Sequence, residues 1–353
     1  MTDVDITTVT DLVISSGSEL GLCFLGALHE SCCRVLRPDL PPEWHPVDIE
    51  RIYGTSIGGI IGCILCLLFP HSLTREEKEK KEEEEKEEEK KEEEEKEKEE
   101  GNNTVKQTWD WLLQYVIKRP WNTVIHEVMC ATNGGDATCH GMISGELLMR
   151  ELLQPLVRVF YSQQQQQNIT LRELYEFSGI TLYLYTVEVN TFTLQEVSWQ
   201  THPELSIYTA VAMTAAIPGI FLPVWYPVNN DTPGCYVDGA VLNRFPLQAC
   251  LERKQNEHTL GRVWGVCCNN SQPRDMKFHP HMSTEDYFVS LVKTMLIALR
   301  PPIQTQCVNS SVGVCHCIPA PDDYLFGVSM LTIILSEDIR QRWITHGACG
   351  LYA

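Results

Sequence analysis

The residues best suited to chemistry lie in the stretch 52–60, which reads IYGTSIGGI. A short apolar strand there reaches a Gly-x-Ser-x-Gly turn and continues as an apolar helix. This pattern is typical of a nucleophile elbow, a strand-to-helix corner that pushes a serine hydroxyl out of the backbone. Gly54 and Gly58 suit it because the corner strains the serine backbone and leaves little room for a Cβ. Ser56 is therefore a candidate nucleophile, although glycine-rich strand-to-helix connections can also be purely structural.

A second candidate feature is the loop at residues 16–21, which reads SGSELG. It follows a predicted strand over Thr8–Ser15 and precedes a predicted amphipathic helix from Leu22 to about Leu36. The first backbone N–H groups of a helix have no intrahelical partner, so they can bind an oxyanion that develops during a reaction. An ordinary turn with Ser18 as the helix N-cap explains the same residues.

The third candidate is Asp238, which ends a predicted strand over Cys235–Val237 and precedes Gly239. A carboxylate at a strand end can reach across a sheet edge, and it can act as a base if it accepts the serine proton at hydrogen-bond distance. A plain Asp-Gly turn is one alternative. A Ser-His-Asp triad is another, with a base drawn from the later histidines His258, His279, His281, His316 and His346.

The rest of the chain contains further apolar strands and amphipathic helices. Strands are expected over 180–189, 221–228 and 263–267, and a hairpin-like segment over 188–199. Helices are expected from residue 104 onward, and then over 144–160, 171–177, 206–216, 287–299 and 328–343.

Composition limits the kind of partner. The chain has 353 residues, 43% of them hydrophobic, and a net charge of -19. The segment 75–100 holds 17 Glu against 9 Lys or Arg and supplies -8 of that charge. The remainder is mildly acidic, so no nucleic-acid partner is expected. Because the segment contains no apolar residue, we interpret it as a Glu/Lys-rich low-complexity insertion, either a solvated helix or a chain without fixed structure.

The 15 cysteines are expected to be reduced thiols, since no secretory signal opens the sequence and the chain is long enough to bury its own core. Cys307 and the run Cys315-His316-Cys317 bear a faint likeness to a zinc site, but no second Cys-x-x-Cys pair accompanies them, so no metal is expected. The longest apolar run, residues 57–69, is too short to span a bilayer. These features predict a cytoplasmic protein.

Taken together, the motifs resemble those of the patatin-like phospholipase family. The resemblance rests on the loop 15–21, the elbow 54–58, the small-residue helix leading to Ala216-Ile217-Pro218, and Asp238-Gly239-Ala240 followed by Asn243 and Pro246. It implies a three-layer α/β/α fold with a mainly parallel central sheet, formed as a single domain over residues 8–350.

The resemblance also implies a set of site residues. Ser56 would be the nucleophile, Asp238 the base, and the backbone N–H groups of Gly17 and Ser18 the oxyanion hole. One departure is Leu20, which stands where the family has a Lys or Arg. The implied activity is that of a serine lipid acyl hydrolase, which cleaves carboxylic ester bonds of phospholipids or related acyl lipids through an acyl-enzyme on Ser56.

No cofactor is implied, and peripheral contact with a membrane is expected because the substrate is a lipid. We expect the helical region 104–160 to form a cap over the site, with Trp111 and Tyr115 off its apolar face; a core-packed helix is the alternative. Two other functions remain open. One is a catalytically silent member of the family that binds membrane or protein, and the other is a triad esterase for small soluble esters.

Overall fold

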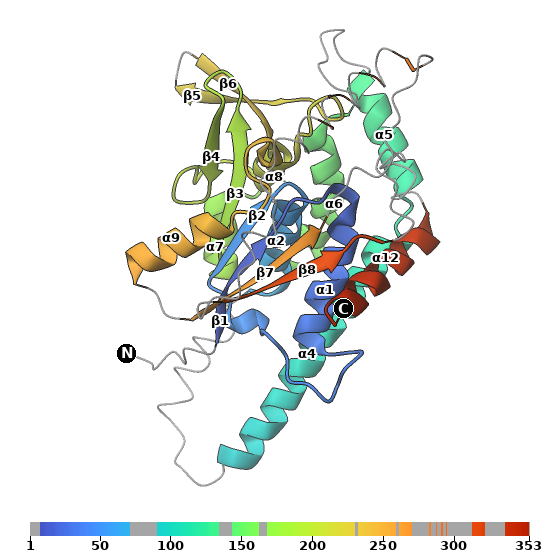
Figure 1. The fold of residues 1–353 in the computed structure, drawn as a ribbon, viewed down its shortest axis with the longest axis vertical. Coiled ribbons are helices and arrows are strands. Elements are labelled where there is room, and N and C mark those ends of the chain that lie inside the picture. Colours follow the sequence, from blue (N-terminus) through green and yellow to red (C-terminus); the bar gives the residue numbers. More distant parts are fainter. Residues whose placement is uncertain are drawn as a thin grey trace.

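The computed structural model describes residues 8–70, 90–133, 143–161, 168–229, 232–258, 261–269, 313–321 and 336–352, with a few isolated positions between 282 and 294. These residues form one sheet with helices packed on both of its faces (Figure 1). The α/β fold class predicted from the sequence is confirmed.

The sheet has eight strands within the described residues, in the order β5-β6-β3-β2-β1-β7-β8, with β4 paired to β3 beside this path. All pairs from β3 through β2, β1 and β7 to β8 are parallel, whereas β4, β5 and β6 join by antiparallel pairing. The strands are β1 (Val9–Ile14), β2 (Arg51–Thr55), β3 (Thr181–Glu188), β4 (Thr193–Val197), β5 (Val224–Asn229), β6 (Thr232–Asp238), β7 (Arg262–Asn269) and β8 (Gly313–Pro319).

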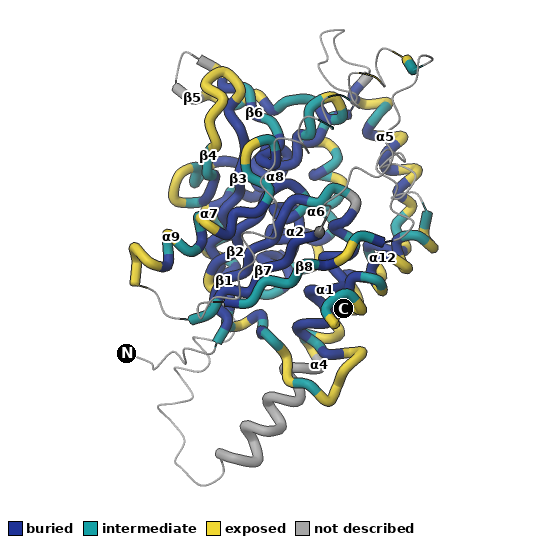
Figure 2. Tube along the Cα trace, viewed as in Figure 1, coloured by how far each residue is buried: buried dark blue, intermediate teal, exposed yellow. Residues whose placement is uncertain are grey.

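Each central strand is buried on both faces (Figure 2), which explains its nearly continuous apolar sequence. Successive side chains point to opposite faces of the sheet, so each strand contributes to two separate cores. In β1, for example, Leu12 and Ile14 join the larger core while Val13 joins the smaller one. In β3, Leu184 and Tyr185 divide in the same way.

The larger core lies under most of the helices, and α9 covers the other face, where Leu247 and Cys250 pack on the tyrosines of β2 and β3. The helices on the larger core are α1 (Gly21–Cys33), α2 (Ile57–Leu68), α4 (Lys90–Lys118), α6 (Gly145–Phe160), α7 (Leu171–Ser178), α8 (Ile207–Ala215) and α12 (Glu337–Gly350); α5 (Trp121–Asn133) packs against α6, and α9 spans Leu247–Glu257.

Several predicted boundaries need correction. The first helix ends at Cys33 rather than near Leu36, because Arg34 adopts a left-handed conformation and caps it. The last helix continues to Gly350, beyond the predicted end at residue 343; it begins at Glu337, where Ser336 caps it by accepting a hydrogen bond from the Ile339 N–H. Residues 328–335 of that prediction lie outside the described residues. Helix α9 and strand β8 were not predicted. The helix expected over 287–299 lies, apart from three positions, outside the described residues.

The structure separates the residues of the weak zinc pattern. On β8, His316 faces one side of the sheet while Cys315 and Cys317 face the other. His316 Nε2 lies 2.7 Å from Glu43 Oε2, and Glu43 also pairs with Arg34 at 2.8 Å. Burial raises the pKa of Glu43, but these partners outweigh it and hold that pKa at about 2. Cys307 lies outside the described residues.

Helix α4 covers part of the predicted insertion. Its backbone begins at Lys90, within the Glu/Lys-rich segment, and continues without interruption to Lys118. Trp109 and Leu112 on its later turns are fully buried in the larger core, and the helix packs against α1 and α12. This part of the helix is therefore core-packed. No helix in the described part of the chain is both long and apolar enough to cross a membrane.

A buried charge cluster joins the first two strands to α9. Asp11 is fully buried, and its carboxylate forms ion pairs with Arg51 Nε and Lys254 Nζ, each at 2.7 Å. Arg51 also reaches the half-exposed Glu257 at 2.9 Å. Since removal of one member leaves the others as uncompensated buried charges, we expect this cluster to be sensitive to mutation.

We predict that Asp11→Asn lowers the free energy of unfolding by about 3–5 kcal/mol, because Arg51 and Lys254 lose their shared counter-charge. Urea denaturation followed by circular dichroism measures this free energy of unfolding. Asp39→Asn is the control, since it breaks an exposed ion pair with Arg37 and should change nothing measurable. An equal change in the free energy of unfolding for the two substitutions would contradict the stabilising role of the buried Asp11 cluster.

Candidate active site

The turn between β2 and α2 holds Ser56 in a strained conformation. Its φ is 57°, a region that non-glycine residues rarely adopt, and only 4% of the residue is exposed. A Cβ on Gly54 would lie 2.6 Å from backbone atoms of Gly58, and a Cβ on Gly58 would lie 2.2 Å from the Ile14 carbonyl oxygen. Only glycine fits at either position, so the corner closes tightly around the serine.

Strand β3 brings Ser56 and Asp238 together, although they are far apart in the sequence. Its residues 181–185 pair with β2, residues 186–188 pair with β6, and residues 184–188 pair with β4. Because a strand has only two edges, β2 and β6 must share one edge while β4 takes the other. Thr55 lies opposite Tyr185 and Asp238 lies opposite Thr186, so β2 and β6 end at adjacent positions of β3.

The two side chains meet at this junction. Ser56 Oγ donates a hydrogen bond of 2.5 Å to Asp238 Oδ2. The other carboxylate oxygen, Oδ1, accepts the Ala240 N–H at 2.7 Å, which fixes the orientation of the group. Asp238 is 3% exposed. A buried carboxylate in direct contact with a serine hydroxyl has the geometry that a general base requires.

The loop before α1 is held by backbone hydrogen bonds to β7 and to the segment between β6 and α9. The Ser15 N–H donates to Val266 O of β7 at 3.0 Å, and the Ser16 N–H donates to Arg244 O at 2.7 Å. Ser18 has a positive φ of 51° and lies at the start of a short 3-10 turn that leads into α1. Ser18 and Ser56 line the same pocket.

Leu20, at the position where a basic residue was expected, is fully buried in the larger core. Its side chain is therefore part of the packing of α1, and a lysine there would have to bury its ammonium group. In this chain the position contributes to stability rather than to a charged surface.

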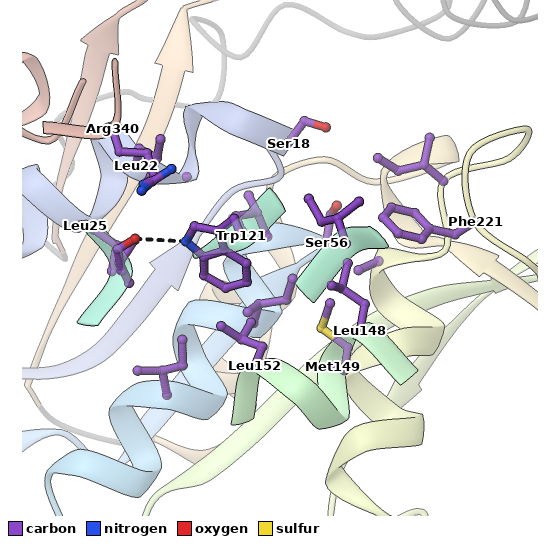
Figure 3. Close-up of a pocket in the computed structure, with 18 residues that line it drawn as sticks. Ser18, Leu22, Leu25, Ser56, Trp121, Leu148, Met149, Leu152, Phe221 and Arg340 are labelled. Atoms are coloured by element: carbon purple, nitrogen blue, oxygen red, sulfur yellow. Dashed lines mark hydrogen bonds between the residues drawn. The ribbon is translucent and has the colours of Figure 1, made fainter. Parts of the chain in front are cut away.

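The pocket at Ser56 has a volume of about 160 Å³ (Figure 3). Eighteen residues line it, and all but Ser18, Ser56 and Arg340 are apolar. They come from α1, α2, α5, α6, α12, the ends of α4 and α8, the turns at Ser18 and Ser56, and the segment after α8 that holds Ile217 and Phe221. Such a lining suits a hydrocarbon chain, which gains free energy by leaving water.

Arg340 and Trp121 are among the pocket residues that were not singled out from the sequence. Arg340 is 3% exposed, and its guanidinium donates to the carbonyl of Ile117 at the end of α4. Burial lowers the pKa of Arg340. Trp121 stands at the start of α5, and its Nε1–H donates to the Val116 carbonyl at 2.9 Å, which fixes the indole against the pocket (Figure 3). Both residues lie far from the motifs in the sequence, so no local sequence pattern pointed to them.

Three of the histidines proposed for a triad fall within the described residues, and they lie away from the pocket. His316 contacts Glu43, His346 Nε2 lies 2.9 Å from the Pro319 carbonyl, and His258 ends α9. None of the three lines the pocket. His279 and His281 fall outside the described residues. Within the described part of the chain, no cluster of His, Cys, Asp and Glu is arranged to hold a metal ion.

A strained serine at a strand-to-helix corner, next to a buried carboxylate on an α/β sheet, has the form of a serine hydrolase site. A family model described as patatin-like phospholipase matches residues 12–251, a range that includes both Ser56 and Asp238. The chain therefore belongs to the patatin-like phospholipase family. It is also similar to a probable lipid hydrolase of Invertebrate iridescent virus 6, with 26% identity over 98 residues, which are 28% of this chain and 32% of that protein.

This chain is also similar to two solved structures of bacterial proteins. VipD from Legionella pneumophila has 12% identity and a TM-score of 0.45, with 98% of this chain and 66% of VipD covered. ExoU, in its complex with SpcU from the type III secretion system of Pseudomonas aeruginosa, has 13% identity and a TM-score of 0.34, with 98% and 52% covered. This chain thus spans about two thirds of VipD and about half of ExoU.

The close packing at the elbow generates a prediction. Gly58→Ala places a Cβ against the Ile14 carbonyl, so β1 and α2 must separate, and we expect a loss of about 3 kcal/mol or more in the free energy of unfolding. Thermal or urea unfolding measures it. Gly145→Ala is the matched control, because the nearest atom to its added Cβ lies 3.7 Å away. If Gly58→Ala is as stable as this control, the corner is looser than described.

Proposed function

We propose that the protein is a serine lipid acyl hydrolase, which cleaves carboxylic ester bonds of phospholipids or related acyl lipids. The observation that carries the proposal is the 2.5 Å hydrogen bond from Ser56 Oγ to Asp238 Oδ2 beside a pocket with an apolar lining. Membership of the patatin-like phospholipase family supports the same activity.

In the proposed reaction, Ser56 Oγ attacks the ester carbonyl carbon while its proton passes to Asp238 Oδ2. The backbone N–H groups of Gly17 and Ser18 stabilise the negative charge that develops on the carbonyl oxygen. The intermediate collapses, the alcohol leaves with the proton from Asp238, and the acyl group stays on Ser56 as an ester. A water molecule, deprotonated by Asp238, then attacks the acyl carbon; the bond to Ser56 Oγ breaks, Asp238 returns the proton to Oγ, and the fatty acid leaves.

The pocket is proposed to hold the acyl chain, because its lining can bury methylene groups at about 0.8 kcal/mol each. Helices α5 and α6, together with the end of α4, supply one side of this pocket. We therefore propose that these helices form the cap and that the cap covers the acyl chain of the substrate. Trp111 stacks on Tyr115 and contacts Phe160, and 37% of it is exposed. Peripheral contact with a membrane is proposed at this aromatic surface, where Trp and Tyr are favoured.

The direct test is release of fatty acid from a mixed lipid panel, detected by mass spectrometry. Wild type should release fatty acid, and Ser56→Ala should release none while keeping the wild-type melting temperature. Asp238→Asn should lower kcat by about 10²- to 10⁴-fold, the usual contribution of a general base. A wild-type protein that binds vesicles but releases no fatty acid from any ester would replace this proposal with a binding role.

The indole of Trp121 is predicted to limit the acyl chain that the pocket accepts. Trp121→Ala removes the nine ring atoms of the indole from the pocket wall. Burial of only two further methylene groups there, at about 0.8 kcal/mol each, should raise the kcat/KM ratio for palmitoyl over butanoyl p-nitrophenyl esters at least about tenfold. Trp199→Ala is the control, since Trp199 stacks on Tyr175 and does not line the pocket. An unchanged chain-length profile in Trp121→Ala would place the acyl chain elsewhere.

A further inference from the structure

A buried threonine on α8 holds the backbone of the candidate nucleophile. The Ser56 N–H donates to Thr214 Oγ1 at 3.0 Å. The same hydroxyl donates its own proton to the Tyr185 carbonyl at 2.5 Å. Thr214 is fully buried, and Tyr185 is the β3 residue opposite Thr55. One hydroxyl therefore links the elbow to the strand that positions both reacting side chains.

The methyl group of Thr214 makes a separate contact. A Cβ on Gly59 would lie 2.8 Å from Thr214 Cγ2, so the methyl group fits against the first turn of α2, where glycine leaves room for it. The two ends of this side chain thus do different things. The hydroxyl binds the Ser56 amide, and the methyl group packs on α2.

The end of α8 is itself fixed to the strands of the site. Thr186 Oγ1 is within hydrogen-bond distance of both the Met213 carbonyl, at 3.0 Å, and the Val237 carbonyl, at 2.7 Å. The Asp238 N–H donates to the Ala216 carbonyl at 2.9 Å. Residues 213–216 therefore contact the backbones on both sides of the Ser56–Asp238 hydrogen bond, which makes Thr214 part of a rigid support.

We propose that Thr214 is a positioning residue for acyl transfer, an inference that rests on the proposed hydrolase function. Its hydroxyl holds the Ser56 amide and so maintains the strained backbone that directs Oγ toward Asp238. A backbone with φ of 57° at a serine persists only when its surroundings determine it. Without this acceptor the Ser56 N–H would be buried and unpaired, and the serine would move to find another partner.

The test separates the hydroxyl from the methyl group. Thr214→Val keeps the methyl group and removes the acceptor, and we expect kcat for a soluble short-chain ester to fall roughly 10- to 100-fold, with KM within about twofold of wild type. The rate of labelling by a fluorophosphonate probe should fall by the same factor. Thr214→Ser keeps the hydroxyl and should retain kcat within about threefold.

Thr132→Val controls for the loss of any buried threonine. Thr132 Oγ1 donates to the Val128 carbonyl and accepts the Ser144 N–H, the same pattern as Thr214, but it contacts neither Ser56 nor Asp238. This variant should lose stability and keep kcat. If Thr214→Val does not fold, Thr214→Ala replaces it, because Ala and Ser both lack the methyl group and differ in the hydroxyl.

Three results would overturn the inference: Thr214→Val with wild-type kcat, Thr214→Ser as impaired as Thr214→Val or Ala, or an equal loss of kcat in Thr132→Val. Failure of the proposed function is distinguishable from each of them, since the wild-type protein would then neither hydrolyse the ester nor react with the probe.

Discussion

One edge of strand β3 is the constraint on which the site depends. It carries β2 as far as Tyr185 and β6 from Thr186 onward, so two strands that arrive from opposite directions end at adjacent positions. Their ends present Ser56 and Asp238 to each other at hydrogen-bond distance. Any slip in either register would separate the pair, because a shift of one residue turns a side chain to the other face of the sheet.

Polar and apolar groups have different roles around this junction. The strained backbone of Ser56 is held by tight glycine contacts and by the hydrogen bond from its N–H to Thr214 of α8, whose hydroxyl in turn donates to the Tyr185 carbonyl of β3. The pocket, by contrast, is almost entirely apolar and is completed by helices outside the elbow and by Arg340 of α12. The family model ends at residue 251, so α12 contributes to the pocket from beyond the matched region.

The sequence predicted the parts of this arrangement that local rules control. Apolar strands, small-residue helices and the Gly-x-Ser-x-Gly corner have short-range patterns, and their elements are confirmed. Helix α9 was missed because its exposed face is strongly polar, and β8 because its run of cysteine and histidine suggested a metal pattern. Thr214 and Arg340 could not be found from sequence, since each acts through contacts with residues distant in the chain. Trp121 could not be found because the pocket that it lines is formed by helices distant in the chain.

The central claim is that Ser56, activated by Asp238, is the nucleophile. The most direct measurement is to react the wild-type protein with a fluorophosphonate, digest it and map the modified residue by tandem mass spectrometry. We expect one adduct, on Ser56, formed far more slowly in Asp238→Asn. An adduct on any other residue, or a labelling rate at Ser56 that does not depend on Asp238, would contradict it.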